Sequence, residues 1–398
     1  MKHRALLGAA LVAAVTAFGL SLPVRAQSLT QGITKDEILL GTVQDLSGPV
    51  VSITKPTLSG MQLRVEQINA AGGVGGRKLK LLVEDTGYDP KRGVLGVQKL
   101  VDSDKVFAFV GNMGTAISLA VAPIIADKGV LNLFPISAHR GNFEPFNRLR
   151  FALITPFDTG IKIGLNELIK KKSITRVGIL YQDDELGLDN LRATEEVLKS
   201  HGLTLVEKAS YKRGATDFSS QAQRLVSASP QLIVMATTTR ETIGSATAMR
   251  QLGYSGAFLG SIAAYQADVA KLGGAPLEGF QAIADYPVMY RDDPKNSKEL
   301  NAWMDAYTAK FSMAPDGYSA TGWVIIDILA KAIAAAGPEP TTDKVTAALE
   351  SMKYDRSFLN NPPYAWSPTR RLGGSQVRIS QVTHGRWVPV SDFLELKQ

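Results

Sequence analysis

The sequence predicts an α/β protein built of two doubly wound parallel-sheet lobes, and three observations lead to this fold class. The chain has 398 residues, more than one hydrophobic core usually organises. Short apolar runs alternate with segments of helical periodicity, an order that predicts parallel strands with helices on both faces of a sheet. A first series of alternating strand and helix segments is followed by a second, which indicates two lobes of similar design.

The first unit of this alternation follows residue 36. In the segment 56–70 apolar residues recur at helical spacing, Pro56 fits a first helical turn, and the glycine run 72–76 ends the helix. The expected elements of the unit are strands at 38–43, 79–84, 106–110 and 130–134 and helices at 56–70, 90–101 and 116–127.

The second unit repeats the pattern. Its expected elements are helices at 158–171, 188–200, 219–227 and 241–251 and strands at 176–181, 203–207, 232–235 and 257–259. The remainder carries a strong helix at 322–336 and two segments, 376–382 and 386–390, that predict an antiparallel hairpin around His384 and Gly385. No flexible linker separates the units, so we expect several short crossings that act as a hinge.

The N-terminus predicts export. Lys2 and Arg4 precede an almost entirely apolar stretch. In the segment Val24-Arg25-Ala26 that follows, Val24 and Ala26 provide small residues at the −3 and −1 positions of a cleavage site. We expect residues 1–26 to be a signal peptide, cleaved after Ala26, and the mature protein to be soluble and periplasmic. No later segment is expected to reach transmembrane length; an uncleaved membrane anchor is the alternative. Removal of residues 1–26 would lower the formal net charge of the chain from +7 to +4.

The chain carries no recognisable catalytic or metal-binding motif. It has no cysteine and only four histidines, and it lacks dinucleotide, P-loop and hydrolase signatures. Its basic residues are spread along the sequence and have no interleaved aromatic residues. We therefore expect no enzyme activity, no cofactor, no metal and no nucleic-acid partner; a secreted α/β enzyme is the less favoured alternative.

The loops after the predicted strands are the candidate ligand site, because ligands of open parallel sheets bind beyond the carboxyl ends of the strands. Thr115 is expected at a helix N-cap, where free N–H groups favour a carboxylate or another anion. The alternative is that Thr115 only caps its own helix. The candidate ligand-binding residues are Ser47, Asn112, Met113, Gly114, Thr115, Ile136, Ser137, Ala138, His139, Leu186, Thr238, Ile262 and Tyr265.

These loops resemble those of the branched-chain amino-acid (Leu/Ile/Val)-binding family, the type I periplasmic solute-binding proteins of ABC transporters. The resemblance runs from about residue 38 to the C-terminus. The segments that carry it are Leu46-Ser47-Gly48-Pro49, the run 68–76, Asp89-Pro90, Val110-Gly111 and Asp217-Phe218.

The resemblance implies two lobes joined by three crossings, closure on a small-molecule ligand by hinge rotation, and delivery to an inner-membrane ABC permease by a monomer. On the family's pattern, lobe one spans 36–153 plus 283–364, and lobe two spans 154–282 plus 365–398. A ligand sensor of the same fold is an alternative use.

Departures from the family pattern bear on the ligand. Amino-acid binders of the family place hydroxyls at the positions of Thr115 and Ala138 and an acid at that of Ile262; only Thr115 matches. A tyrosine common at Leu186 is missing, as are both partners of a frequent disulfide, at Tyr88 and Gly114.

Because a buried ammonium group needs a partner, we expect a carboxylate without an essential α-ammonium, such as an aromatic or oxo acid. Tyr265 would offer such a ligand a flat surface. An amino acid remains the alternative if Asp183, Asp184 or Glu185 replaces the missing acid.

Overall fold

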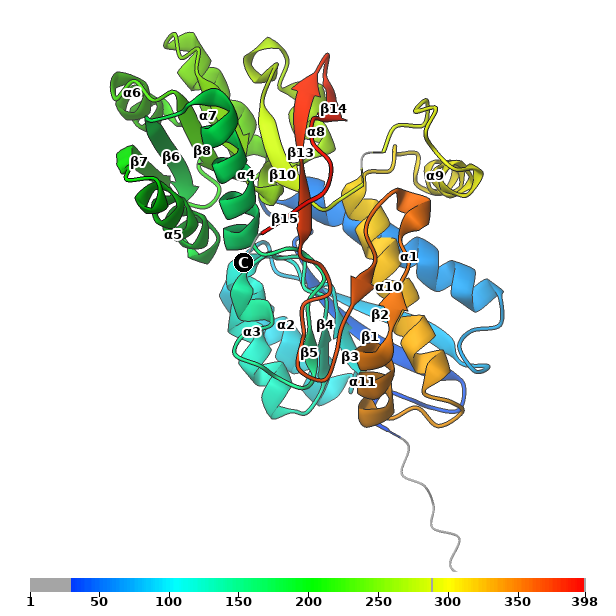
Figure 1. Ribbon diagram of the computed structural model, residues 1–398. Coiled ribbons are helices and arrows are strands. Elements are labelled where there is room, and N and C mark those ends of the chain that lie inside the picture. The colour runs from blue at the N-terminus through cyan, green and yellow to red at the C-terminus, as the bar shows by residue number, and fades with distance from the viewer. Residues whose placement is uncertain (1–29, 288, 397–398) are drawn as a thin grey trace, which may run out of the picture.

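The computed structural model describes residues 30–287 and 289–396, and it consists of two α/β lobes stacked one above the other (Figure 1). The predicted signal peptide and its cleavage site lie outside the described residues. The two-lobed α/β fold class predicted from the sequence is confirmed.

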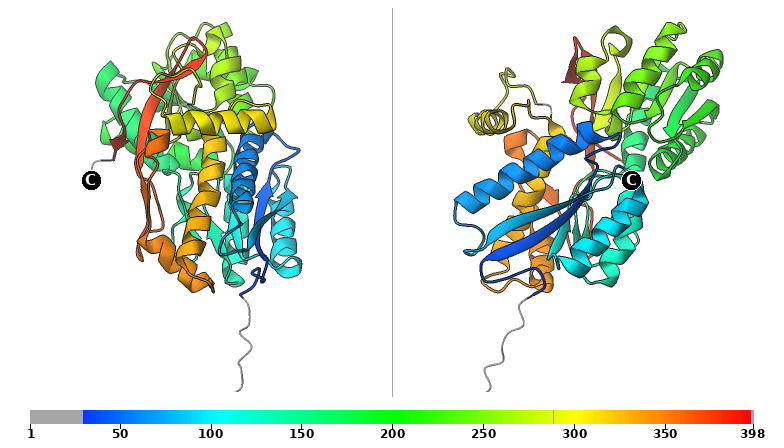
Figure 2. Two further views of the ribbon diagram at one scale, coloured as in Figure 1. Left: turned by 90° about the vertical axis from the view of Figure 1, so that its right-hand side faces the viewer. Right: turned by 180° about the vertical axis from the view of Figure 1, so that it is seen from behind.

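The first lobe is built on a five-stranded parallel sheet in the order β2-β1-β3-β4-β5. Its strands are β1 (Glu37–Gln44), β2 (Lys78–Asp85), β3 (Ala108–Val110), β4 (Leu131–Leu133) and β5 (Arg150–Phe151). Helices α1 (Val51–Ala70) and α10 (Gly317–Ala335) cover one face, and α2 (Pro90–Gln98) and α3 (Thr115–Asp127) cover the other (Figure 2). The buried strand β3 is a continuous apolar run because helices lie on both faces of the sheet.

The second lobe is built on a mixed sheet in the order β14-β13-β10-β9-β8-β6-β7, with β15 paired to β13. Its strands are β6 (Val177–Gln182), β7 (Leu205–Tyr211), β8 (Leu232–Ala236), β9 (Ala257–Gly260), β10 (Gln281–Ala284), β13 (Gln376–Thr383), β14 (Arg386–Pro389) and β15 (Leu394–Glu395). Its main helices are α4 (Phe157–Lys172), α5 (Glu185–Ser200), α6 (Ser219–Ser227) and α7 (Thr239–Gln251).

The predicted hairpin of β13 and β14 is confirmed. The strands pair antiparallel, and the two turn residues, His384 and Gly385, have φ of 51° and 72°. Positive φ at both central residues matches the twist of the flanking strands, which is why glycine suits the second position.

Several elements differ from the prediction. Helix α1 starts at Val51, so Pro56 lies inside the helix and not in its first turn as expected. It is tolerated because the carbonyl that it leaves unbonded belongs to Ser52, which is only half-buried and near the helix start. The helix expected at 90–101 ends at Gln98 and continues as a π-helical turn to Ser103.

The unpredicted elements are short or lie in the C-terminal region. They are β5 and β10, α8 (Ala267–Leu272), α9 (Lys298–Phe311), α11 (Thr342–Ser351), β11 (Lys353–Tyr354), β12 (Tyr364–Ala365) and β15.

Helices α1 and α10 pack at very short range. A Cβ atom on Gly60 would lie 1.9 Å from the carbonyl oxygen of Ser319, and one on Gly322 would lie 2.0 Å from that of Thr57. Contrary to the sequence expectation, α10 has the length and apolar composition that a membrane crossing requires. Most of it is nevertheless buried inside the first lobe, where it serves as a core helix.

The chain crosses between the lobes three times, after β5, after β10 and after β12, and hydrogen bonds join the crossings. The Thr155 N–H donates to Asp285 Oδ2 (3.3 Å), and the Thr155 hydroxyl donates to the carbonyl of Gln376 (3.1 Å). The Asn361 amide donates to the carbonyl of Asp285. Complete burial raises the pKa of the Asp285 carboxyl to about 6.

Candidate ligand-binding cavity

A cavity lies between the two lobes, at the carboxyl ends of their parallel strands. Its enclosed volume is about 40 Å³. Its lining consists of Val50, Ile53, Tyr88, Met113, Gly114, Thr115, Ile136, Ser137, Ala138, Ile154, Phe157, Leu186, Thr238, Ile262, Ala263, Tyr286 and Tyr318.

The N-terminus of α3 forms the polar part of the first-lobe wall. Gly114, at φ 99°, is the N-cap, and Thr115 is the first helical residue, so the expected placement of Thr115 at the N-cap is wrong by one position. The difference arises because the loop needs positive φ at the N-cap; a Cβ on Gly114 would also lie 2.7 Å from the Tyr88 ring.

Thr115 does not cap its helix. Its Oγ1 lies 3.0 Å from Ser137 Oγ, which joins the loops after β3 and β4. The first amides of α3 have no acceptor within the helix and carry the positive end of its dipole. Two hydroxyls and a helix N-terminus thus meet on one wall, an arrangement suited to a carboxylate.

The second-lobe wall is largely apolar. Leu186 lies in the first turn of α5, Ile262 lies in a short 3₁₀ turn after β9, and Thr238 is the N-cap of α7. The Tyr318 hydroxyl of the first lobe donates to the carbonyl of Ile262 at 3.4 Å, so the two walls also touch directly.

No Asp, Glu, Lys, Arg or His belongs to the cavity lining that the structure describes. The three acids considered as substitutes for the acid missing at Ile262 lie elsewhere. Asp183 is exposed and pairs with Lys212 (3.0 Å). Asp184 caps α5 through the N–H of Leu186 (3.1 Å), and burial raises the pKa of its carboxyl. Glu185 is exposed.

Nine of the thirteen predicted site residues line the cavity, and four do not. The exposed Ser47 donates its hydroxyl to Asp85 (2.7 Å), and the buried Asn112 accepts a hydrogen bond from the Val43 N–H (3.1 Å). His139 Nδ1 accepts from the Gly141 N–H (2.9 Å). Tyr265 packs on Trp387, with ring centroids 4.7 Å apart, beside a separate hollow. In each case the side chain contacts other residues of the protein outside the cavity lining.

The prediction missed eight lining residues: Val50, Ile53, Tyr88, Ile154, Phe157, Ala263, Tyr286 and Tyr318. Most are apolar and cannot be told from core residues in the sequence. Tyr286 and Tyr318 reach the cavity from the second crossing and from the start of α10. Their rings meet edge to face with centroids 4.5 Å apart, and they come together only through the tertiary fold.

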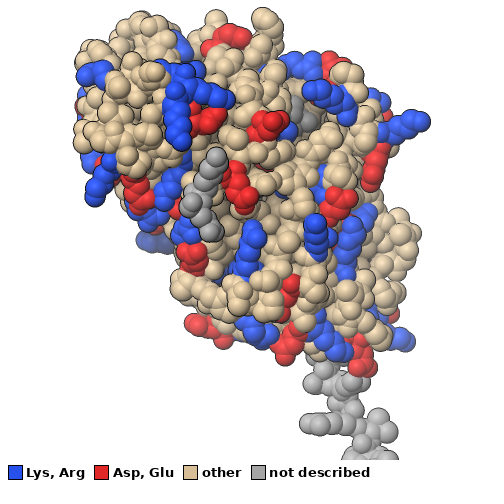
Figure 3. All heavy atoms as spheres, viewed as in Figure 1, with Lys and Arg blue, Asp and Glu red and all other residues tan. Residues whose placement is uncertain are grey.

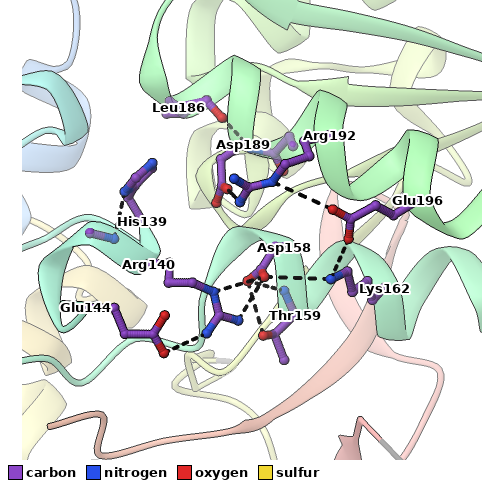
Figure 4. A network of polar contacts seen from close by, with 12 residues as sticks. His139, Arg140, Glu144, Asp158, Thr159, Lys162, Leu186, Asp189, Arg192 and Glu196 are labelled. Carbon is purple, nitrogen blue, oxygen red and sulfur yellow. Dashed lines mark hydrogen bonds and ion pairs between the residues drawn. The ribbon is translucent and has the colours of Figure 1, made fainter. Parts of the chain in front are cut away.

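A network of charged side chains lies next to the cavity-lining residues, and we call it the rim; it comprises His139, Arg140, Glu144, Asp158, Lys162, Asp189, Arg192 and Glu196. Figure 4 shows the loop that carries His139 and Arg140 on one side and α5, with Asp189 and Arg192, on the other. Arg140 bridges to Asp158 of α4 (2.8 Å) and to Glu144 (2.9 Å).

The rim contains carboxyls and an imidazole with displaced pKa values. Burial lowers the pKa of His139 and raises that of Asp189, which has one oxygen without a partner among the described residues. Burial also opposes ionisation of Asp158, but its bonds to Arg140 hold the pKa of this carboxyl below its usual value. Elsewhere on the face seen in Figure 3, Lys and Arg side chains are interspersed with Asp and Glu.

Sequence comparisons identify a matching family and relatives of this chain. A sequence model of the family described as periplasmic binding protein matches residues 37–386. An amino acid binding protein of Pseudomonas aeruginosa is 22% identical over 301 residues, covering 76% of this chain and 79% of that protein. The leucine-, isoleucine-, valine-, threonine- and alanine-binding protein of the same organism is 24% identical over 321 residues, covering 80% and 84%.

Solved structures share the fold with this chain. A branched-chain amino acid ABC transporter protein of Thermus thermophilus with bound valine superposes with a TM-score of 0.80 at 17% identity, covering 92% of this chain and 98% of that chain. A solute-binding protein of an ABC transporter from R. palustris in complex with benzoate superposes with a TM-score of 0.77 at 15% identity, covering 89% and 95%.

Proposed function

Because the chain belongs to the periplasmic binding protein family, we propose that it captures a small carboxylate without an essential α-ammonium group, an aromatic or oxo acid, for an inner-membrane ABC permease. The observation that carries this proposal is the lining of the cavity. Its described part combines an anion-favouring helix N-terminus with walls that hold no charged side chain.

The free energy of burying charge separates the two ligand classes. A carboxylate at the start of α3 would meet the Thr115 and Ser137 hydroxyls and free amides, which replace its hydration. An α-ammonium group in the same cavity would meet no carboxylate. Leaving a buried charge without a partner costs several kcal/mol, so the site favours the acid without the amino group.

The comparisons leave both classes open at the level of the fold. One structural neighbour holds valine and another holds benzoate. Curated relatives named for amino acids make an amino acid the second candidate. The lining of this chain, with Ile262 and Leu186 on the second wall, favours the aromatic or oxo acid.

We also propose that the lobes, 36–153 plus 283–364 and 154–282 plus 365–398, rotate about the three crossings to enclose the ligand. Contacts between the lobes support this closure. The Arg213 guanidinium donates to the carbonyl of Tyr88 (3.3 Å), and the Ser52 hydroxyl donates to Thr239 Oγ1 (3.3 Å). Both contacts would be lost when the cleft opens.

Calorimetry with leucine, its 2-oxo acid and phenylacetate tests the ligand class. We expect at least one of the two acids to bind and leucine to bind more weakly. Tight leucine binding without a response to either acid would contradict the proposal. X-ray scattering with the bound acid tests closure, because ligand should reduce the radius of gyration of the mature protein.

A further inference from the structure

The second-lobe wall contains a pair of side chains with an unusual bonding pattern. Thr238 is the N-cap of α7 and Glu241 follows three residues later, the spacing of a capping box. In a capping box each side chain would bond a backbone N–H of the other residue. Here Thr238 makes no capping bond, and its Oγ1 instead donates to Glu241 Oε2.

This bond fixes what Thr238 presents to the cavity. Thr238 lines the cavity and is 3% exposed, whereas Glu241 is 1% exposed and lies outside the lining. A hydroxyl group has one proton, and an ionised carboxylate only accepts. Because the proton of Thr238 points to Glu241, its oxygen can offer the cavity only lone pairs.

We propose that Thr238, oriented by Glu241, selects ligands that carry a hydroxyl group in addition to their carboxylate, which makes a hydroxylated aromatic acid the preferred ligand class. This inference rests on the proposed function. The ligand's carboxylate would lie at Thr115 on the first-lobe wall, and its hydroxyl would donate to Thr238 Oγ1 on the second. A ligand bonded in this way would join the two lobes.

The pair also predicts which ligands are rejected. An ether oxygen or a second carboxylate would face the lone pairs of Thr238 with lone pairs of its own. An ammonium group would be a donor, but it would meet a neutral hydroxyl while the Glu241 carboxyl lies outside the lining. Desolvating that ammonium group would therefore remain largely uncompensated.

The experiment compares phenylacetate, its 3- and 4-hydroxy derivatives and 4-methoxyphenylacetate by calorimetry on the mature protein. We expect one hydroxylated isomer to bind about 2- to 12-fold more tightly than phenylacetate, the range for one hydrogen bond between neutral groups. The methoxy compound should bind no more tightly than phenylacetate.

Variants assign this preference to the pair. Thr238→Val should reduce the affinity ratio of hydroxylated to parent acid to about 1, and Thr238→Ser should retain it. Glu241→Gln can donate its amide to Thr238, which frees the hydroxyl proton and should narrow the gap between hydroxyl and methoxy ligands. The matched control is Thr247→Val, a half-buried threonine of α7 outside the lining, which should keep the wild-type ratio.

The outcomes separate this inference from the proposed function. Equal binding of phenylacetate and both hydroxylated acids by the wild type would overturn the inference and leave acid binding intact. Binding of leucine without any of the acids would overturn the proposed function. If Thr238→Val does not fold, the Glu241→Gln variant provides the test. A wild-type affinity ratio of hydroxylated to methoxylated acid in folded Glu241→Gln would also overturn the inference.

Discussion

The interior of the cavity and its rim are made by the same segments but differ in character. In the loop after β4, Ser137 and Ala138 line the interior, whereas the next two residues, His139 and Arg140, belong to the rim. In α5, Leu186 lines the interior and Asp189, nearly one turn later, belongs to the rim. The described interior lacks charged side chains, while the rim consists almost entirely of them.

Under the proposed function, the interior would select the ligand and the rim would help to hold the lobes closed. Uncharged walls make affinity sensitive to every polar group that a ligand brings, because an unmatched group is costly in a buried site. One ion pair of the rim, Arg140–Asp158, joins the lobes, and neither residue lines the cavity. Changes to the interior should therefore alter which ligand binds, and changes to the rim should weaken all ligands alike.

The largest change in ligand affinity is expected when a charged side chain is placed in the interior of the cavity. Ile262→Glu should weaken binding of the preferred acid at least about 100-fold, because two buried carboxylates repel each other and lack counter-charges. Calorimetry measures the loss. The matched control is Ile262→Gln. Glutamine has nearly the shape of glutamate without its charge, so this variant should lose far less affinity. Equal losses for the two variants would show that shape, and not charge, governs the interior.

Removing the hydroxyl at the start of α3 should have the next largest effect. Thr115→Val should weaken acid binding about 10- to 100-fold, the range for a hydrogen bond to a charged group. Thr346→Val, at a buried threonine of α11 outside the cavity, controls for the substitution itself. Undiminished affinity in Thr115→Val would mean that the carboxylate does not lie at this helix.

A rim substitution should weaken all ligands by a smaller and uniform factor. Arg140→Gln breaks the bond to Asp158; because Arg140 is 38% exposed, solvent screens the pair and we expect about a 2- to 5-fold faster dissociation. Stopped-flow measurement with two different ligands checks that the factor is the same. Glu144→Gln, which removes only an exposed partner of Arg140, should change little. A ligand-dependent factor would break the distinction between rim and interior.

The smallest effect on ligand binding is expected at the hinge. There the titration of Asp285 should change the stability of the fold with pH without changing the interior of the cavity. The pKa of Asp285 is about 6 in the folded protein, against 3.8 for the free side chain. Between these values the unfolded chain releases a proton that the folded protein keeps. The contribution of Asp285 to stability therefore falls as pH rises from about 4 to about 6 and stays low above that.

Asp285→Asn should remove this pH dependence. Its Tm relative to wild type should be higher at pH 7.5 than at pH 4.5 by about 2–4 °C, corresponding to roughly 2 kcal/mol in a chain of this length. The order of ligand affinities should not change between these pH values. A Tm difference that is the same at both pH values would exclude Asp285 as the titrating group.

The sequence predicted what depends on local pattern. The alternation of apolar runs and helical periodicity predicted the parallel strands of both lobes, and the loops after β3 and β4 supplied most of the predicted residues on the first-lobe wall. It missed β10 and β15 because four and two residues are too few to show a period.

The errors in the site have two physical causes. Ser47 and Asn112 are polar loop residues, but the protein uses their side chains for its own hydrogen bonds, a choice that the sequence does not reveal. Tyr286 and Tyr318 are far apart in sequence and meet only because α10 returns to the first lobe beside the second crossing.

The close packing of α1 against α10 bears on how such a protein can acquire new ligands during evolution. Gly60 and Gly322 admit no side chain, so the backbone spacing of the two helices is fixed where these glycines lie. Residues at or near the starts of the same helices, Ile53 and Tyr318, face the cavity. Substitutions there can reshape the site while the glycine contact preserves the framework. The sequence positions that define the scaffold and those that define its ligand are thus separated along single helices.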